Sequence, residues 1–236
     1  MFHTSSKVAW RDLSAFVIYI LGQITLPFMI LTVFTQLNIS IPEPIMLMFG
    51  IILTSLMVIL FLIVSHRQQF RSKLAIQLKN LRQHFKLIVF TYVGYLLSNA
   101  IFMTIMTQFP TQWQFKDTGN QNSLMIFFEQ PIWLPFVFLG IVILTPMTEE
   151  LLFRHVLIGE LGKKFGVGFM SILSVVSFAL LHMQTAHSPL EIIPYLLLGA
   201  MFTITYVKSN GNIVVAMVTH MMNNGIAFIA ILQQMT

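Results

Sequence analysis

Long apolar runs separated by short polar segments occupy most of the chain. A helix needs about 20 residues to cross about 30 Å of hydrocarbon. The runs that meet or approach this length are 13–37, 44–64, 87–108, a run starting near 131, 168–183, 190–207 and 211–232. The run 168–183 is short, so about six to eight spans fit the sequence. The pattern predicts an all-α fold, a polytopic transmembrane helical bundle of about seven spans.

Composition excludes several other classes of protein. Of the 236 residues, 56% are hydrophobic and 9% are charged, against about 25% charged in an ordinary soluble domain. This leaves too little polar surface for a soluble enzyme or a nucleic-acid-binding module, and too much apolar surface for a disordered chain. The chain has no cysteine, which excludes disulfides, a cysteine nucleophile and cysteine-ligated zinc.

Basic residues indicate the orientation of the predicted bundle. The segment 65–86 holds several Lys and Arg residues and no acidic one, which is typical of a cytoplasmic loop. Lys7 and Arg11 place the N-terminus on the same side, and the loop 109–130 then lies outside. Lys163, Lys164 and Lys208 then fall inside again. We therefore expect a multi-pass protein of the cell membrane. The alternative use of 65–86 is binding of anionic lipid or a peptide partner.

The chain divides into two parts by the polarity of its spans. Residues 1–130 form N-terminal transmembrane helices with the basic cytoplasmic loop 65–86, and their spans carry no charge. Residues 131–236 contain the polar residues that need an explanation, all of them after residue 144. We expect the last four spans of the bundle to form the functional core.

Two adjacent acids, Glu149 and Glu150, interrupt an otherwise apolar span. An ionised residue at a span's centre costs about 2.5–3.5 kcal/mol on insertion scales. Glu150 can pair with Arg154, four residues later on one helix face, which leaves Glu149 available for chemistry. The alternative is a helix that begins at Pro146, where acids complement the macrodipole.

Two further polar groups follow on later spans. His182 ends the run 168–183, and His220 and Asn224 share one face of the last span. Considered alone, His182 could be a packing residue, and Asn224 could form a hydrogen bond between helices. Glu149 and His182, however, each lie about 16 residues, or roughly 25 Å, from the turn near 165. His220 and Asn224 lie about 15–21 Å beyond the next cytoplasmic turn. We therefore predict one intramembrane pocket that opens toward the cytoplasm.

A carboxylate beside an imidazole can activate water as a general base. A second histidine and an asparagine can donate hydrogen bonds to a developing oxyanion. Attack of water on an amide is the simplest chemistry for this set, and no cofactor is expected. Zinc is the mechanistic alternative, because two histidines and a glutamate can bind it, but the spacing is not that of a short zinc motif.

The three motifs together resemble the CPBP family, which comprises the CAAX-protease and bacteriocin-processing (Abi-type) membrane proteins. The family pattern is E-E-x-x-x-R, F-x-x-x-H and H-x-x-x-N or D. It is matched in order by Glu149-Glu150 with Arg154, by Phe178 with His182, and by His220 with Asn224. The resemblance covers roughly residues 131–232.

The resemblance implies an intramembrane glutamate-type endopeptidase. It implies that Glu149 and His182 act on water, that His220 and Asn224 form the oxyanion site, and that Glu150 and Arg154 support them. The expected substrate is a membrane-associated peptide or protein, such as a bacterial peptide precursor, with the lipid bilayer as surroundings and no nucleic acid. The alternatives are a non-enzymatic bacteriocin-immunity or regulatory membrane protein and, less favoured, a proton-coupled transporter.

Overall fold

The computed structural model describes residues 7–235, and within this range the chain is helical, with no strand. The α-helices are α1 Ser14–Gln36, α2 Glu43–Ser65, α3 Arg67–Asn80, α4 Phe85–Met106, α5 Gly119–Leu124, α6 Leu134–Phe138, α7 Thr145–Glu150, α8 Gly162–Phe165, α9 Val167–Leu181, α10 Ile192–Lys208 and α11 Ile213–Met235. Leu139–Leu144 and Leu151–Leu161 are π-helical. Short 3-10 turns are Trp10–Leu13, Leu81–His84, Thr111–Trp113, Met125–Phe127, Pro131–Trp133 and Pro189–Glu191. The predicted all-α fold is confirmed.

Six helical segments of the described range are long and apolar enough to cross a membrane. They are Trp10–Gln36, Glu43–Ser65, Arg67–Met106, Pro131–Phe165, Pro189–Lys208 and Ile213–Met235. The remaining predicted span, 168–183, corresponds to α9, which has 15 residues and is therefore short for a full crossing. The chain is a multi-pass membrane protein, and its spans lie within the predicted range.

The basic segment 65–86 is helical rather than a loop. Helix α3 continues through the turn Leu81–His84 into α4, so that Arg67–Met106 forms one helical segment of 40 residues. The physical reason is local: residues 67–86 contain Gln, Leu, Lys and Arg, which favour helices, and neither Gly nor Pro. We predicted a loop from the charge of this segment, but charged residues by themselves do not disfavour a helix.

The described chain forms two compact units, each assembled from separate segments. Unit 1 contains residues 7–8, 75–124 and 153–219, and unit 2 contains residues 9–74, 125–152 and 220–235. Each unit therefore combines segments from both sides of residue 130. The predicted division into 1–130 and 131–236 concerns function, and it stays a prediction.

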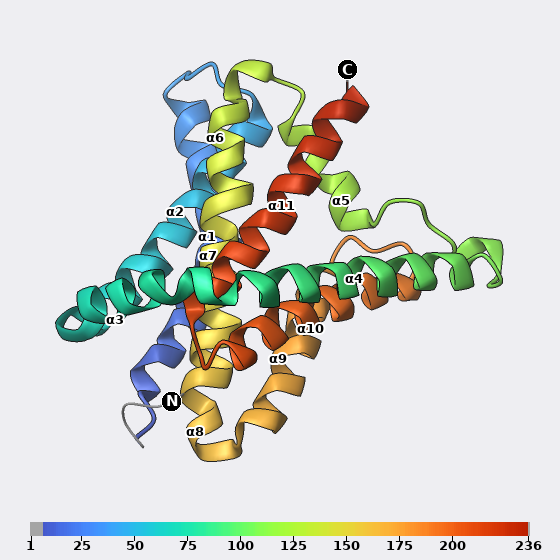
Figure 1. The fold of residues 1–236 in the computed structure, drawn as a ribbon. Coiled ribbons are helices and arrows are strands. Elements are labelled where there is room, and N and C mark those ends of the chain that lie inside the picture. Colours follow the sequence, from blue (N-terminus) through green and yellow to red (C-terminus); the bar gives the residue numbers. More distant parts are fainter. Residues whose placement is uncertain (1–6, 236) are drawn as a thin grey trace. The chain divides into compact units, whose positions relative to one another are not determined.

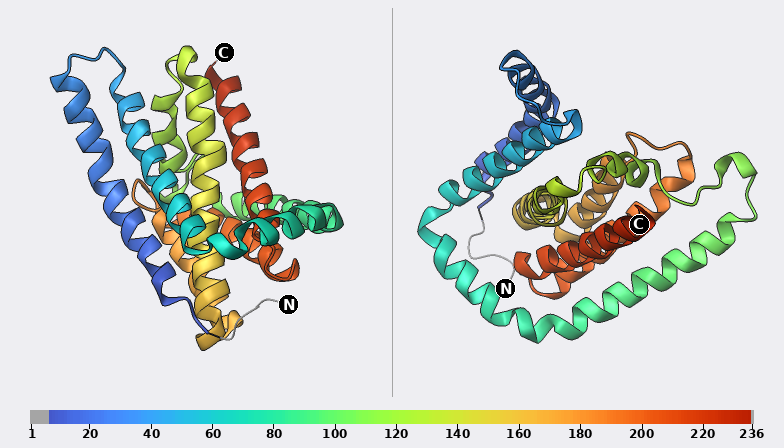
Figure 2. Two further views of the ribbon diagram at one scale, coloured as in Figure 1. Left: turned by 90° about the vertical axis from the view of Figure 1, so that its left-hand side faces the viewer. Right: turned by 90° about the horizontal axis from the view of Figure 1, so that it is seen from above.

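In unit 2, α1 and α2 pack side by side (Figures 1 and 2). A Cβ atom on Gly50 would lie 2.4 Å from the backbone nitrogen of Pro27, so this close approach needs glycine. The same pair of helices is closed by Asp12 and His66, whose Oδ2 and Nε2 atoms are 2.7 Å apart. Asp12 is fully buried, and this contact therefore ties the start of α1 to the end of α2.

The helix that carries the two adjacent acids packs against α2 and α11 within unit 2. On one side, a Cβ on Gly140 would come within 2.7 Å of the sulfur of Met48 on α2. On the other, the ring of Phe228 on α11 lies 5.3 Å from that of Phe138, measured between centroids. These contacts hold the π-helical stretch Leu139–Leu144 between neighbouring helices.

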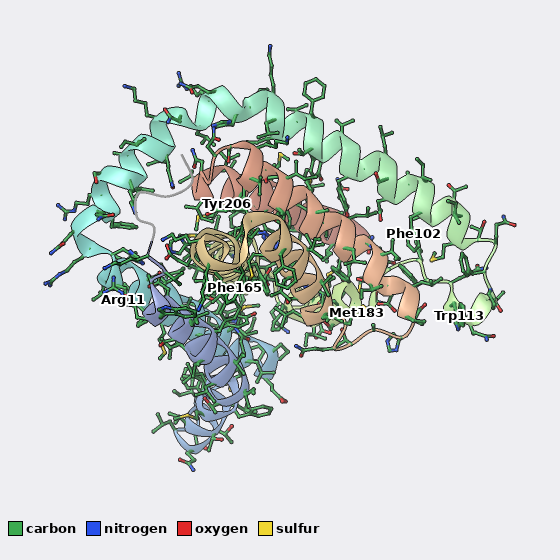
Figure 3. All side chains as sticks on the ribbon, turned by 90° about the horizontal axis from the view of Figure 1, so that it is seen from below. Arg11, Phe102, Trp113, Phe165, Met183 and Tyr206 are labelled. Atoms are coloured by element: carbon green, nitrogen blue, oxygen red, sulfur yellow. The ribbon has the colours of Figure 1, made fainter. Side chains whose placement is uncertain are left out.

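Unit 1 is built around α10, which lies beside α9 and α4 (Figure 1). A Cβ on Gly199 would lie 3.3 Å from the backbone oxygen of Val175, so α9 and α10 approach closely. Trp113 and Met183 lie toward one end of α10, and Tyr206 lies toward the other (Figure 3). Tyr206 packs there with Ile158 and Ala216 in a buried cluster.

Both predicted turns between the last helices are present. Gly166, with a φ of 87°, separates α8 from α9. Asn210 and Gly211, with φ values of 57° and 78°, separate α10 from α11. Positive φ angles favour glycine and asparagine at such positions. The residues at both predicted turns thus adopt the backbone conformation that such turns need, and the predicted heights of the candidate site residues stay a prediction.

Candidate active site

Unit 2 brings the two acids together with the histidine of the third motif. Glu149 and Glu150 end α7 and are 4% and 0% exposed, and His220 on α11 is 3% exposed. Nδ1 of His220 lies 2.8 Å from Oε1 of Glu150, and its Nε2 lies 3.8 Å from Oε2 of Glu149. With Glu150 ionised, Nδ1–H must be the donor, because a carboxylate only accepts. Glu150 therefore orients the His220 ring so that its Nε2 faces Glu149.

Asn224, one helical turn after His220, binds the backbone of the helix that carries the acids. Its Nδ2 donates to the carbonyl oxygen of Ile141 at 3.0 Å. Ile141 lies in the π-helical stretch, where each carbonyl pairs with the N–H five residues later. For Ile141 that residue is Pro146, which has no N–H. The Asn224 amide therefore donates to Ile141 the hydrogen bond that Pro146 cannot donate.

Unit 1 holds the arginine of the first motif among aromatic rings. Arg154 is fully buried, and its Nη2 donates to the carbonyl oxygen of Gly199 at 3.0 Å. Its guanidinium carbon lies 4.9 Å from the ring centroid of Phe178 and 5.4 Å from that of Phe202. Cation–π contacts of this kind stabilise a desolvated charge. The phenylalanine of the second motif thus contacts the arginine of the first.

The same phenylalanine also contacts His182, which follows α9. The two ring centroids are 4.5 Å apart, and Nδ1 of His182 lies 2.9 Å from the carbonyl oxygen of Phe178. Because a carbonyl only accepts, Nδ1 carries the proton in this bond, and Nε2 of the neutral ring presents a lone pair. The fold therefore gives His182 the tautomer that a general base needs at Nε2.

The donor set of unit 2 also bears on the zinc alternative. Carboxylate oxygens and imidazole nitrogens both bind zinc. Nδ1 of His220 is engaged with Glu150, so Nε2 of that ring and the Glu149 carboxylate are the donors of this cluster that fit such a role. The third ligand of the alternative, His182, belongs to unit 1. Zinc binding stays the untested alternative to a reaction without a cofactor, and the pair of Glu150 with Arg154 stays a prediction.

Comparison with known proteins gives a match to a protein family. Residues 131–226 match a family model described as Type II CAAX prenyl endopeptidase Rce1-like. The predicted resemblance to CAAX-type membrane proteases is confirmed. The matched CAAX-protease-like region contains all six candidate site residues, and it is somewhat less than half of the chain. No curated protein and no solved structure matches the chain.

Sequence reasoning missed several residues that contact the candidate site residues of the CAAX-protease-like region. Phe202, Gly199 and Ile141 have no motif of their own and no polar side chain that would single them out. Tyr195 was also missed, although its ring stacks on His182 at 4.7 Å between centroids, with 25° between the planes. A tyrosine near the start of an apolar helix is common, so the sequence alone gave no signal for this contact.

Proposed function

We propose that the chain is a membrane-embedded endopeptidase that hydrolyses a peptide bond of a membrane-associated peptide or protein. The observation that carries the proposal is the buried cluster of Glu149, Glu150 and His220 within a region that matches an endopeptidase family. Acids are costly in a membrane span unless a function requires them. Processing of a bacterial peptide precursor is the finer form of the same proposal.

We assign Glu149 and His182 to the activation of water. In this step the water oxygen attacks the peptide carbonyl carbon, and Glu149 accepts a proton as the main base. We assign Nε2 of His182 to the same activation step, because the bond at Nδ1 leaves its lone pair open to accept a hydrogen bond from water. The proton is then returned to the leaving amine, so that hydrolysis is balanced without a covalent intermediate.

We assign His220 and Asn224 to the oxyanion. Nε2 of His220 donates only when the ring holds both protons, with Nδ1–H bound to Glu150. The Asn224 amide carries two N–H groups, of which one is bound to Ile141. Glu150 positions His220, and Arg154 supplies a buried positive charge in the same motif. Donors fixed in this way stabilise charge that develops during the reaction.

The proposal is tested with the purified protein in detergent and a mixture of membrane peptides. We expect new peptide termini by mass spectrometry, absent from a parallel sample of the Glu149→Gln protein and unchanged by 1,10-phenanthroline. Loss of cleavage with the chelator, restored by added zinc, would favour the metal-dependent mechanism. If no peptide is cut and Glu149→Gln keeps full biological activity in cells, the chain is a binding protein of the immunity or regulatory kind.

We further propose that the N-terminus and the segment 65–86 lie in the cytoplasm and that substrate enters from that side. The basic residues of α3 support this orientation. Because the chain has no cysteine, single cysteines can be introduced on an unlabelled background at two exposed positions, Ser72 and Gln112.

We expect a membrane-impermeant maleimide to label Gln112→Cys in intact cells and Ser72→Cys only after permeabilisation. The cysteine-free parent should give no label in either condition. The reverse pattern of labelling would overturn the proposed orientation.

A further inference from the structure

A buried carboxylate of unit 1 ties together two segments that are far apart in the sequence. Glu191 is 1% exposed. Its Oε1 accepts from the backbone N–H groups of His187 at 2.8 Å and Ser188 at 3.0 Å. Its Oε2 accepts from the backbone N–H of Gly119 at 2.6 Å. Hydrogen bonds to an ionised acceptor are stronger than neutral ones, so Glu191 fixes the segment before α5 against the loop that follows His182.

The fit between these two segments is close. A Cβ atom on Gly119 would lie 1.8 Å from the carbonyl oxygen of Thr185, so no other residue fits there without a shift of the backbone. The hydroxyl of Ser188 also donates to the carbonyl oxygen of Trp113 at 2.7 Å. The segment 113–119 thus has a defined position relative to the loop 183–188.

This position places Thr118 against Tyr195. The hydroxyl oxygens of the two residues are 2.6 Å apart. Tyr195 lies one helical turn after Glu191, and its ring stacks on His182. A continuous set of contacts therefore runs from Glu191 through Gly119 and Thr118 to the ring of Tyr195 and from there to His182.

We propose that Tyr195, held at its hydroxyl by Thr118, is a positioning residue that fixes the plane of the His182 imidazole. The hydrogen bond from Nδ1 to Phe178 restrains one edge of the imidazole, and the stacked Tyr195 ring restrains its face. The inference rests on the proposed function, because it gives His182 a reaction to be positioned for. It also goes beyond that function, because Thr118 and Glu191 were assigned no role and Thr118 precedes the family-matched region.

The inference predicts a loss of kcat at nearly constant KM. Misplacement of a reacting group by about 1 Å can cost about 100-fold in rate. We expect Tyr195→Leu, which removes the stacked ring, to lower kcat by about 100-fold. Tyr195→Phe keeps the ring and should retain most of the activity, with a loss of about 3- to 10-fold. Thr118→Val should match Tyr195→Phe, and the double variant should be no worse than either, because both variants remove the hydrogen bond between the two hydroxyls.

The matched control is Tyr206→Phe, a buried tyrosine toward the other end of α10, which should leave kcat unchanged. Each variant is purified and its thermal unfolding midpoint is measured beside the kinetics on a peptide that the wild type cuts. If Tyr195→Leu does not fold, Thr118→Val decides. A lowered kcat at an unchanged midpoint supports the inference, and a wild-type kcat overturns it.

His182→Ala separates this inference from the function on which it rests. If His182→Ala cuts at the wild-type rate, the proposed role of His182 is wrong. If His182→Ala is inactive while Tyr195→Leu and Thr118→Val keep the wild-type kcat, only the positioning role is wrong. A drop in kcat for Tyr206→Phe equal to that for Tyr195→Phe would also overturn the inference, because it would show a general effect of removing a buried hydroxyl.

Discussion

Replacement of Glu149 by glutamine is expected to lower the rate of peptide cleavage by about 100- to 10,000-fold. Glutamine has nearly the same shape as glutamate, so the packing at the end of α7 should be kept. It cannot accept the proton of an attacking water, because its amide is not a base. The measurement is kcat on a peptide that the wild type cuts, with unfolding in detergent as the test of an intact fold.

The neighbouring acid provides the sharpest comparison. In Glu150→Gln the side-chain carbonyl can still accept from Nδ1 of His220, so we expect a smaller loss than for Glu149→Gln. Glu43→Gln removes an exposed acid and should leave the rate unchanged. Equal losses for Glu149→Gln and Glu150→Gln would show that the two carboxylates act as a unit, and wild-type cleavage by folded Glu149→Gln would exclude Glu149 as the base.

Replacement of Arg154 by methionine is expected to cost about 3.5–5 kcal/mol of folding stability. Methionine fills much of the same volume but loses the cation–π contacts, worth about 2 kcal/mol when desolvated, and a charged hydrogen bond to Gly199, worth about 1.5–3 kcal/mol. The stability of Arg154→Lys should fall between those of the wild type and Arg154→Met, because an ammonium keeps the charge but lacks the planar fork of a guanidinium. The measurement is the free energy of unfolding in detergent.

The matched control for Arg154 is Arg71→Met on α3, where the side chain is exposed and the expected change is within about 0.5 kcal/mol. If Arg154→Met unfolds at the same denaturant concentration as the wild type, the aromatic surroundings of Arg154 contribute little to stability. The residue would then be retained for the reaction alone.

The sequence predicted the class of fold and the turns well, because both depend on local signals. Apolar length identifies a span, and Gly166 and Gly211 stand where positive φ angles are needed. The segment 65–86 was predicted wrongly as a loop, because its charge is a signal of orientation and says nothing against a helix. The sequence could not decide whether α9 is a full span, because its apolar run is shorter than a full crossing needs.

The candidate site was predictable where its chemistry is unusual for a membrane. Glu149, Glu150 and His220 are groups that a bilayer disfavours, and the structure brings these three together in unit 2. The bond of Asn224 to Ile141 depends on a π-helical turn beside a proline, which no simple periodicity reveals. The stacking of Tyr195 on His182 depends on two helices and a loop, and ordinary residues make that contact.

The position of Gly119 and Thr118 limits how the family-matched region can be exchanged between proteins. A chimaera that transplanted only residues 131–226 would carry every motif residue and still lose Gly119, which binds Glu191, and Thr118, which binds Tyr195. Transfer of activity from one relative to another should therefore succeed only when the junction is placed before Trp113, so that the preceding segment travels with the loop it binds.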